Sequence, residues 1–143
     1  MGSEDVYKRQ LLGWSQCHQQ GEKVWFPNDQ LQTVRYMAPE CFADDYVADP
    51  ASDVYSLGAM IYHLFTMTPP IQSQSIEELI ENRMDLIPED LIIQQPDCPP
   101  ALNTLVKQML STNVAMRPTF RETLNELIGI EISHLTNQTV IQL

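Results

Sequence analysis

The sequence is poor in basic residues. Eight Lys and Arg stand against 19 Asp and Glu, which gives a net charge of -11. An acidic surface of this kind repels phosphate backbones and anionic lipid, so nucleic acid and membrane surfaces are not expected as partners. A basic peptide fits the charge better. The acidity is also compatible with a solvated surface that serves solubility alone.

Cysteine is also scarce. The three cysteines, Cys17, Cys41 and Cys98, lie far apart in the sequence and form no CxxC pair. Their spacing matches no metal site, so no metal ligand is expected in the chain. Reduced thiols in a cytoplasmic protein are the expectation.

The chain has no long hydrophobic run. Its longest apolar-rich segment, Val54 to Met67, is interrupted by Ser56 and His63 and is too short to span a bilayer. Met1 to Gln10 has no apolar stretch, and no signal peptide is expected there. Residues 1–10 show neither helix nor strand periodicity. They are interpreted as a cloning or sequence-assembly scar, and the natural protein is expected to extend further upstream.

The composition otherwise fits one globular domain. The chain has 143 residues, of which 43% are hydrophobic, and no internal repeat is apparent. The pattern predicts four helices, long loops and almost no strand, so the fold class is mainly α. Ser52 is expected to act as the N-cap of a central helix that ends near Met67. Its apolar residues surround the axis, which predicts a helix buried in the middle of the domain.

Three further helices are expected to pack around this central helix. The first runs from Ser75 to about Arg83, has a capping box, and has an inner face made of Ile76, Leu79 and Ile80. Asp85 to Gln95 is expected to be irregular. The next helix begins at Pro99 and Pro100, and its inner face follows the helical period through Leu102, Leu105, Val106, Met109 and Leu110. Thr119 and Glu122 cap the last helix, with Phe120, Leu124, Leu127 and Ile128 expected to face inward.

Three sequence blocks occur in a fixed order. They are TVRYMAPE at Thr33–Glu40, SDVYSLG at Ser52–Gly58, and RPT at Arg117–Thr119. In this order, with helices between them, they resemble the C-terminal lobe of protein kinases, with the Ala-Pro-Glu signature in the first block. The resemblance implies the helical lobe of the kinase-like fold, built around a buried central helix. It divides the chain into a partial kinase domain at 11–131 and a C-terminal extension at 132–143.

The resemblance also assigns scaffold roles. Ala38, Pro39 and Glu40 would end the activation segment, and Glu40 would form a buried, bidentate pair with Arg117. Without the resemblance, Glu40 could simply cap a turn and Arg117 could be a solvated charge.

In the second block, Asp53 would accept hydrogen bonds from the backbone of the catalytic loop, and Gly58 would belong to the same scaffold. Asp53 also fits an ordinary first-turn Asp that is favoured by the helix dipole. His63 lies inside the central helix and is interpreted as a residue satisfied within the fold.

Thr33 and Tyr36 would lie in the substrate-docking loop. In Ser/Thr kinases the matching Thr contacts the catalytic Asp and Lys, so Thr33 favours Ser/Thr specificity. Gln32 departs from the family's Gly before this Thr. Between Ser15 and Thr33 the sequence has no Ser, Thr or Tyr, so no phosphorylation switch is expected in the middle of the loop.

The magnesium-binding motif is degenerate. Gly13, Trp14 and Ser15 occupy the Asp-Phe-Gly position, and Gly13 offers no carboxylate for the magnesium ion on the ATP phosphates. This indicates either a pseudokinase or an artefact at the junction with the scar. No Gly-rich loop, Val-Ala-Ile-Lys strand or His-Arg-Asp loop is present, so no catalytic residue is assigned to this chain.

The resulting hypothesis is the C-terminal part of a Ser/Thr protein kinase whose intact parent transfers the ATP γ-phosphate to protein Ser or Thr. The chain would supply the docking platform and scaffold, would need the N-terminal lobe in cis, and would be inactive and prone to aggregate alone. It would bind no cofactor itself, and ATP and Mg²⁺ are implied only for the active parent. The alternatives are a pseudokinase that acts as a scaffold and an unrelated helical interaction domain.

Overall fold

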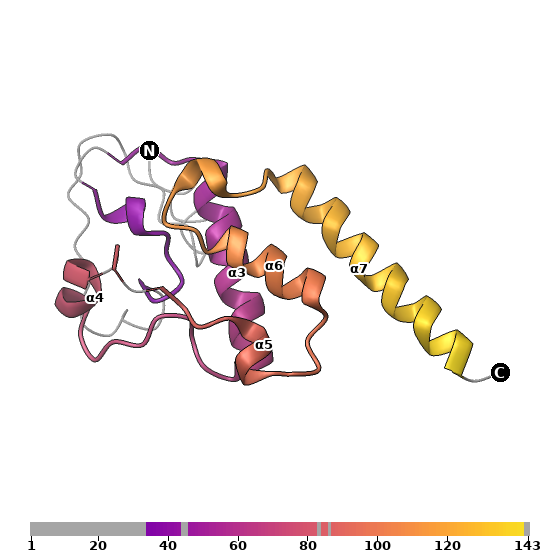
Figure 1. Ribbon diagram of the computed structural model, residues 1–143. Helices are drawn as coiled ribbons and strands as arrows, with labels where there is room; N and C mark the ends of the chain where they lie inside the picture. Colours follow the sequence, from indigo (N-terminus) through magenta and orange to yellow (C-terminus); the bar gives the residue numbers. More distant parts are fainter. Residues whose placement is uncertain (1–33, 44–45, 83, 86, 142–143) are drawn as a thin grey trace, which may run out of the picture.

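The computed structural model describes residues 34–43, 46–82, 84–85 and 87–141. In chain order, its elements are η2 (Pro39–Phe42), α3 (Pro50–Thr66), α4 (Ile76–Asn82), α5 (Leu91–Gln94), α6 (Pro100–Met109), η3 (Val114–Met116) and α7 (Phe120–Ile141) (Figure 1). Across these ranges the chain is helical, with no strand, so the predicted fold class is confirmed. None of these helices is both long enough and apolar enough to cross a membrane.

The N-cap of the central helix lies three residues before the predicted one. Asp49 caps α3, because its side chain accepts a hydrogen bond from the Ala51 N–H at 2.7 Å. Pro50 follows at the first helical position, where the missing N–H costs nothing. The prediction that Ser52 is the N-cap was therefore wrong. The predicted end was right, because the helix closes at Thr66 and Met67 takes the left-handed conformation, with φ of 59°.

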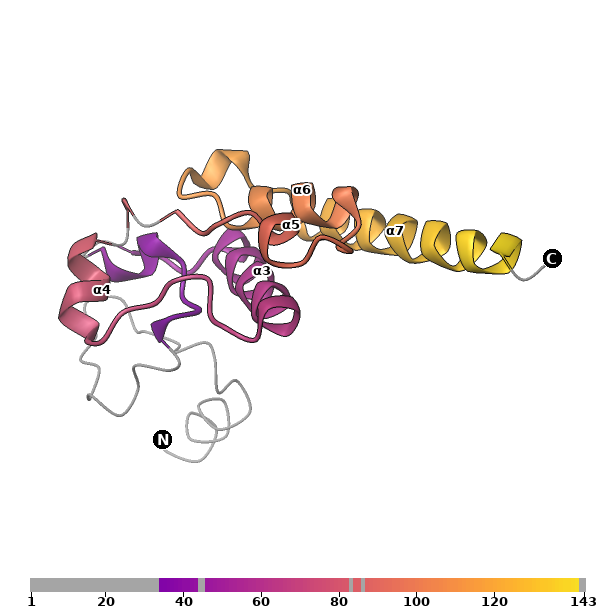
Figure 2. The same cartoon turned by 60° about the horizontal axis from the view of Figure 1, so that its bottom comes forward.

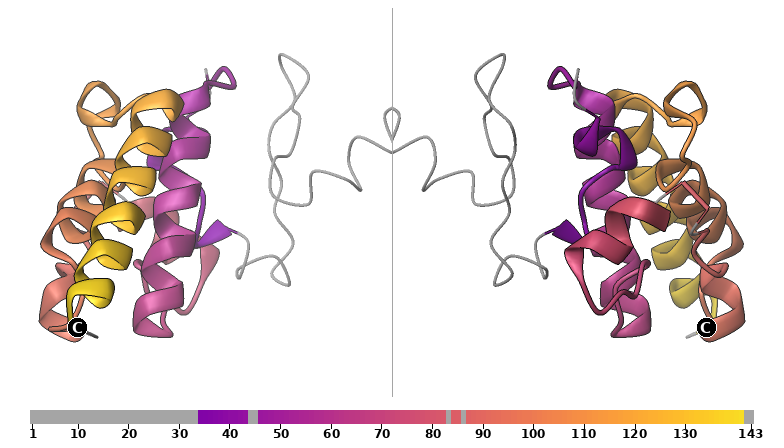
Figure 3. Two further views of the ribbon diagram at one scale, coloured as in Figure 1. Left: turned by 90° about the vertical axis from the view of Figure 1, so that its right-hand side faces the viewer. Right: turned by 90° about the vertical axis from the view of Figure 1, so that its left-hand side faces the viewer.

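Helix α3 is central but is not buried on every side. Helices α5, α6 and α7 pack against it. The elements η2 and α4 lie on the side of α3 opposite α7 (Figure 3). The buried residues of the helix are Ser52, Val54, Tyr55, Gly58, Ala59 and Tyr62. Met60 and Phe65 are exposed, and Leu64 is 74% exposed. The predicted all-round burial was therefore wrong for this chain, because no described residue covers that side of α3.

Gly58 allows α3 and α6 to approach closely. A Cβ at this position would lie 2.7 Å from the Cβ of Met109. Real carbon–carbon contacts are longer than this, so any side chain at position 58 would push the two helices apart. Glycine is required here because of Met109 on the neighbouring helix.

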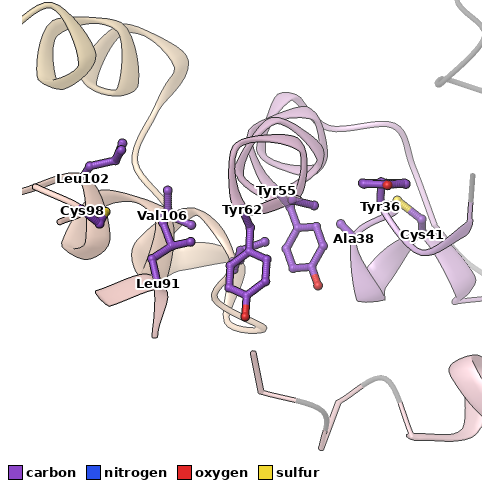
Figure 4. Close-up of a cluster of buried hydrophobic side chains, with 11 residues drawn as sticks. Tyr36, Ala38, Cys41, Tyr55, Tyr62, Leu91, Cys98, Leu102 and Val106 are labelled. Carbon is purple, nitrogen blue, oxygen red and sulfur yellow. The ribbon is translucent and has the colours of Figure 1, made fainter. Parts of the chain in front are cut away.

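The main core joins η2, α3, α5 and α6. Figure 4 shows Tyr55 and Tyr62 of α3 between Ala38 and Cys41 on one side and Leu91 and Val106 on the other. Ile61 is partly buried against it. A second cluster holds α4 through Val34, Ile71, Ile76 and Leu79, and a third joins Val54 to Leu105 and Met109. The inner faces predicted for α4 and α6 are therefore confirmed.

The capping of α4 differs in detail from the prediction. The Ser75 hydroxyl accepts the hydrogen bond from the Glu78 N–H at 3.1 Å, as expected. The Glu78 carboxylate, however, accepts from the Gln74 N–H and the Ser73 hydroxyl instead of from the Ser75 N–H.

The short helix α5 lies inside a segment that was predicted to be irregular. It is held by Leu91, which is fully buried, and four residues give too short a periodic signal to detect.

The last helix has the predicted cap but a different inner face. Thr119 and Glu122 form the reciprocal capping box, with bonds of 2.7 to 3.3 Å. The residues that face the body are Thr123, Leu127 and Ile130. Of the predicted inner residues, only Leu127 is correct, and Phe120, Leu124 and Ile128 are exposed. The helix continues to Ile141, and its C-terminal half extends past the other helices (Figures 1 and 2).

Candidate functional site

The segment from Val34 to Phe42 is fixed on the surface of α3. Val34 and Ala38 are fully buried, and Pro39 opens the 3-10 helix η2. Because proline has no N–H and a fixed φ, it begins such a turn at little cost. The turn places the Glu40 side chain beside the N-terminal end of α3.

Glu40 and Arg117 form a bidentate ion pair across 77 positions of sequence. The two guanidinium nitrogens donate to Oε1 at 2.5 Å and to Oε2 at 2.8 Å. The Arg117 side chain has 0% of its surface exposed and that of Glu40 has 23%. The predicted pairing is confirmed, with the cation fully buried and the carboxylate partly open to water.

Arg117 is satisfied by more than the carboxylate. Its Nε donates to the Ser111 carbonyl at 2.8 Å, and Nη1 also donates to the Ala51 carbonyl at 3.0 Å. The guanidinium lies over the Tyr55 ring, 5.0 Å from the centroid, in cation–π geometry. A buried charge is tolerated when hydrogen bonds and an aromatic face replace water around it in this way. Arg117 therefore joins four chain segments at one point.

The environment of Glu40 favours its ionised form. Burial alone would raise the pKa of this carboxyl, but hydrogen bonds from Arg117, the backbone and Ser52 outweigh burial and lower the pKa. The Ser52 hydroxyl donates to Oε1 at 2.8 Å. Ser52 therefore acts as a partner of Glu40, a role that its position in the sequence did not indicate. Nearby, burial raises the pKa of Tyr55 to about 12, so this ring stays neutral.

Tyr36 is anchored to the other end of the central helix. Its hydroxyl and Nδ1 of His63 are joined by a hydrogen bond, and the two rings stack with centroids 5.8 Å apart and an interplanar angle of 6°. His63 is thus satisfied within the fold, as expected. Tyr36 is buried, so its side chain contributes to anchoring the segment.

A third anchor was missed from the sequence. Arg35 donates from Nη2 to the carbonyl of Ser73, in the segment before α4. The Ser73 hydroxyl in turn donates to Glu78 at 2.8 Å. Arg35 lies inside the first sequence block, and this position could have marked it as a candidate functional residue. Ser73 carries none, because its carbonyl becomes a partner only when the chain folds back.

Several predicted residues are not joined to this anchor. Asp53 is exposed in the first turn of α3, and its carboxylate meets no donor within the described part of the chain. Thr33, Gly13, Trp14 and Ser15 lie outside the described residues. The expectations attached to these five residues are therefore untested.

The described residues offer anchoring contacts and no metal site. Within residues 34–141, apart from 44–45, 83 and 86, no three His, Cys, Asp or Glu side chains are grouped to hold a metal ion. Gly13, Trp14 and Ser15 add no carboxylate, so no step through magnesium is assigned to this chain. Cys41 and Cys98 are buried free thiols, and burial raises the pKa of both. They are packed as small apolar residues and are poor nucleophiles.

The model of the protein kinase domain family matches residues 12–127. Among similar proteins, the insulin receptor-related protein of Cavia porcellus is 33% identical over 68% of this chain and 7% of its own length. The Wee1-like protein kinase of Oryza sativa subsp. japonica is 33% identical over 66% of this chain and 17% of its own length. The probable serine/threonine-protein kinase PkwA of Thermomonospora curvata is 37% identical over 68% of this chain and 12% of its own length.

The chain therefore spans only a small part of each of these proteins. The matched segment, residues 12–127, contains the whole anchor from Val34 to Arg117. The relatives include a receptor-related protein and a serine/threonine-protein kinase. The comparisons therefore identify the domain and do not distinguish which amino acid a kinase containing this chain would phosphorylate.

Proposed function

Because this chain belongs to the protein kinase domain family, we propose that it is the substrate-docking platform and scaffold of a Ser/Thr protein kinase. The observation that carries the proposal is the ion pair of Glu40 and Arg117, which ties the end of the docking segment to the loop before α7. A platform for phosphoryl transfer has to be rigid, since the reaction depends on positioning the acceptor hydroxyl.

Two further contacts support a rigid platform. Tyr36 is fixed to α3 through His63, and Arg35 is fixed to the segment before α4 through Ser73. The three anchors are spread over six residues of one segment and end on α3, on the segment before α4 and on the loop before α7. Thr33, which immediately precedes this segment, would contact the catalytic Asp and Lys of the parent protein from a fixed base.

Asp53 is placed where it could bind a catalytic loop. Its carboxylate is exposed at the start of a helix whose opposite side is buried. A carboxylate placed there can accept backbone N–H groups from a neighbouring loop. We propose that this loop, with the ATP-binding lobe, belongs to the parent protein. ATP and magnesium would bind there, and this chain alone would be inactive.

The test uses the reading frame that contains this chain together with its upstream coding sequence. The purified protein is given ATP and peptide pools in which Ser, Thr or Tyr is the sole acceptor. Transfer to Ser and Thr pools, lost in Thr33→Val and retained in Thr33→Ser, is the expected result. Transfer to the Tyr pool alone would contradict the Ser/Thr assignment. The 143-residue chain by itself should transfer no phosphate.

A pseudokinase that acts as a scaffold is the second candidate. The Gly13-Trp14-Ser15 sequence favours it, because a magnesium site there would lack its carboxylate. Calorimetric titration of the longer protein with ATP, with and without magnesium, separates the two functions. Tight binding that requires magnesium excludes the pseudokinase, and no binding together with an intact fold supports it.

The charge and the thiols support two further parts of the proposal. A net charge of -11 favours basic peptides as substrates through long-range attraction. Peptides with added Lys or Arg should be phosphorylated faster at low salt than at high salt, and equal rates would contradict this.

The buried free thiols Cys41 and Cys98 fit a reducing compartment, and we place the parent domain in the cytoplasm. Localisation of a tagged full-length protein tests this placement.

A further inference from the structure

A cavity of about 230 Å³ lies between α3, α6 and the segment that leads into α5, and we name it the α3–α6 pocket. Four buried side chains form its floor: Tyr62, Leu91, Val106 and Leu110. Figure 4 shows Leu91 and Val106 beside the Tyr62 ring. None of the lining residues belongs to the segment from Val34 to Phe42, so this pocket is separate from the anchored docking segment.

The volume of the pocket limits what it can hold. Sites for cofactors and drug-sized ligands usually measure about 300–1,000 Å³, so this one is too small for a nucleotide. It is much larger than the space of about 30 Å³ that one water molecule takes up. A single large side chain, such as that of Trp or Phe, matches the volume and the apolar floor. Protein partners commonly place one such anchor residue in a pocket of the other protein.

The rim of the pocket is negatively charged. Glu89, Asp90 and Lys107 are the charged residues of its lining. Nζ of Lys107 lies 2.9 Å from Oδ1 of Asp90, so these two charges offset each other and Glu89 leaves the rim with a net negative charge. The pKa of Tyr62 is raised, first by burial and then by the charges of Glu89 and Asp90. The negative potential therefore reaches the floor, and a cation at the mouth would be attracted.

Hydrogen bonds fix the wall that carries this charge. Nε2 of Gln94 donates to the Glu89 carboxylate and to the Tyr62 hydroxyl, both at 3.1 Å. The side-chain oxygen of Asn103 accepts from the Ile92 N–H at 3.2 Å, which ties α5 to α6. The pocket is thus formed before a partner binds, and little ordering of the protein opposes binding.

We propose that the α3–α6 pocket binds a basic segment of a partner protein by enclosing one large apolar side chain of that segment. A Lys or Arg beside this anchor would lie against Glu89, and Ile87, which is 82% exposed and lines the pocket, would contact the anchor at the mouth. Charge complementarity selects this partner over an acidic segment or a second copy of the chain, since each copy has a net charge of -11. The proposal concerns binding and does not depend on phosphoryl transfer.

Fluorescence anisotropy of a rhodamine-labelled peptide, GKKWKKG, tests the proposal with the 143-residue chain. Saturable binding is expected at about 0.05 M NaCl, and it should weaken at about 0.5 M NaCl because salt screens the rim. Replacing the Trp of the peptide by Ala should raise the dissociation constant about ten-fold, since the anchor is lost. Replacing its lysines by glutamates should abolish binding.

Substitutions at exposed positions separate the pocket from the general charge of the chain. Glu89→Gln keeps the shape of the side chain and should weaken binding of the Trp peptide about three- to five-fold. Glu131→Gln removes the same charge from α7 and should leave binding nearly unchanged. Lys107→Gln should tighten binding about two- to three-fold because it releases the Asp90 carboxylate. Arg121→Gln, which changes the net charge equally on α7, is its control.

Four outcomes would overturn the proposal. They are no saturable binding of the Trp peptide, equal binding of the peptide with Ala in place of Trp, equal weakening by Glu89→Gln and Glu131→Gln, and binding of free indole as tight as that of the peptide. The last outcome would identify a small-molecule site. Circular dichroism checks the helix content of each variant. If Glu89→Gln loses helix, Ile87→Ala replaces it with Ile93→Ala, an exposed isoleucine outside the pocket, as control, and equal effects of these two overturn the proposal.

Discussion

Arg117 holds Glu40 by two parallel hydrogen bonds, of 2.5 and 2.8 Å, while its Nε and Nη1 also donate to the carbonyls of Ser111 and Ala51. The two partners are unequal. The guanidinium is fully buried and has four hydrogen bonds, whereas the carboxylate is partly exposed and also accepts from Ser52. This inequality determines how each substitution should behave.

Glu40→Ala should lower the free energy of unfolding by about 3 kcal/mol, because it leaves a buried cation with two carbonyls and an aromatic face as its only partners. Arg117→Ala should cost about 5 kcal/mol, since it also removes the contacts with Ser111, Ala51 and the Tyr55 ring. Urea titration followed by circular dichroism gives both values. Equal losses would mean that the further contacts of Arg117 add nothing to stability, and a loss under 1 kcal/mol for Glu40→Ala would mean that the pair does not stabilise the fold.

The charge-reversed double variant Glu40→Arg with Arg117→Glu should recover only a small part of the loss. A carboxylate at position 117 would face the carbonyls of Ser111 and Ala51, which are acceptors like itself. A double-mutant cycle with Glu40→Ala and Arg117→Ala measures the coupling more cleanly. Strictly additive losses in that cycle would contradict a direct interaction.

The stability of the pair should depend on acid pH. The pKa of Glu40 is below its ordinary value of 4.5 in the folded chain, so the unfolded chain takes up a proton first as the pH falls. The pair is therefore fully stabilising above pH 4.5, and its contribution is lost as the pH falls through the lower folded pKa. The difference in urea midpoint between wild type and Glu40→Gln should shrink from pH 7 to about pH 3. A constant difference would show that the charge of Glu40 is not responsible.

Two glycine-to-alanine substitutions should change the free energy of unfolding in opposite directions. Gly58→Ala places a methyl group 2.7 Å from the Cβ of Met109 and should destabilise the fold by about 1–3 kcal/mol. Gly129→Ala meets no atom within 4 Å on an exposed helix and should stabilise it by about 0.5–1 kcal/mol. Thermal unfolding of the two variants, side by side, gives the comparison. A neutral Gly58→Ala would argue against the close approach of α3 and α6.

The two described cysteines should resist thiol reagents while the chain is folded. Cys41 and Cys98 are buried, and burial raises the pKa of both thiols, so little thiolate is present at pH 8. In a Cys17→Ser background, a chromogenic disulfide reagent should react slowly in buffer and quickly in urea. Rapid reaction under native conditions would show that this part of the core opens readily.

The sequence by itself determined the helical class, the ends of the central helix to within three residues, and the family. These depend on short-range chemistry: the apolar period of α6, the prolines that begin helices, and the Thr119–Glu122 capping box. The ordered motifs also led to the pairing of Glu40 with Arg117, through the family resemblance.

The tertiary structure alone decided which faces are covered. Phe120, Leu124 and Ile128 have the spacing of an inner face, yet the crossing of α7 over α3 buries Thr123 and Ile130. Similarly, α3 is apolar all round in sequence, but no described residue covers Leu64. Periodicity states that a side of a helix is apolar. Only the position of the neighbouring elements determines whether that side meets protein or water, and the same holds for partners such as Ser52 and Ser73, which are brought into reach by folding.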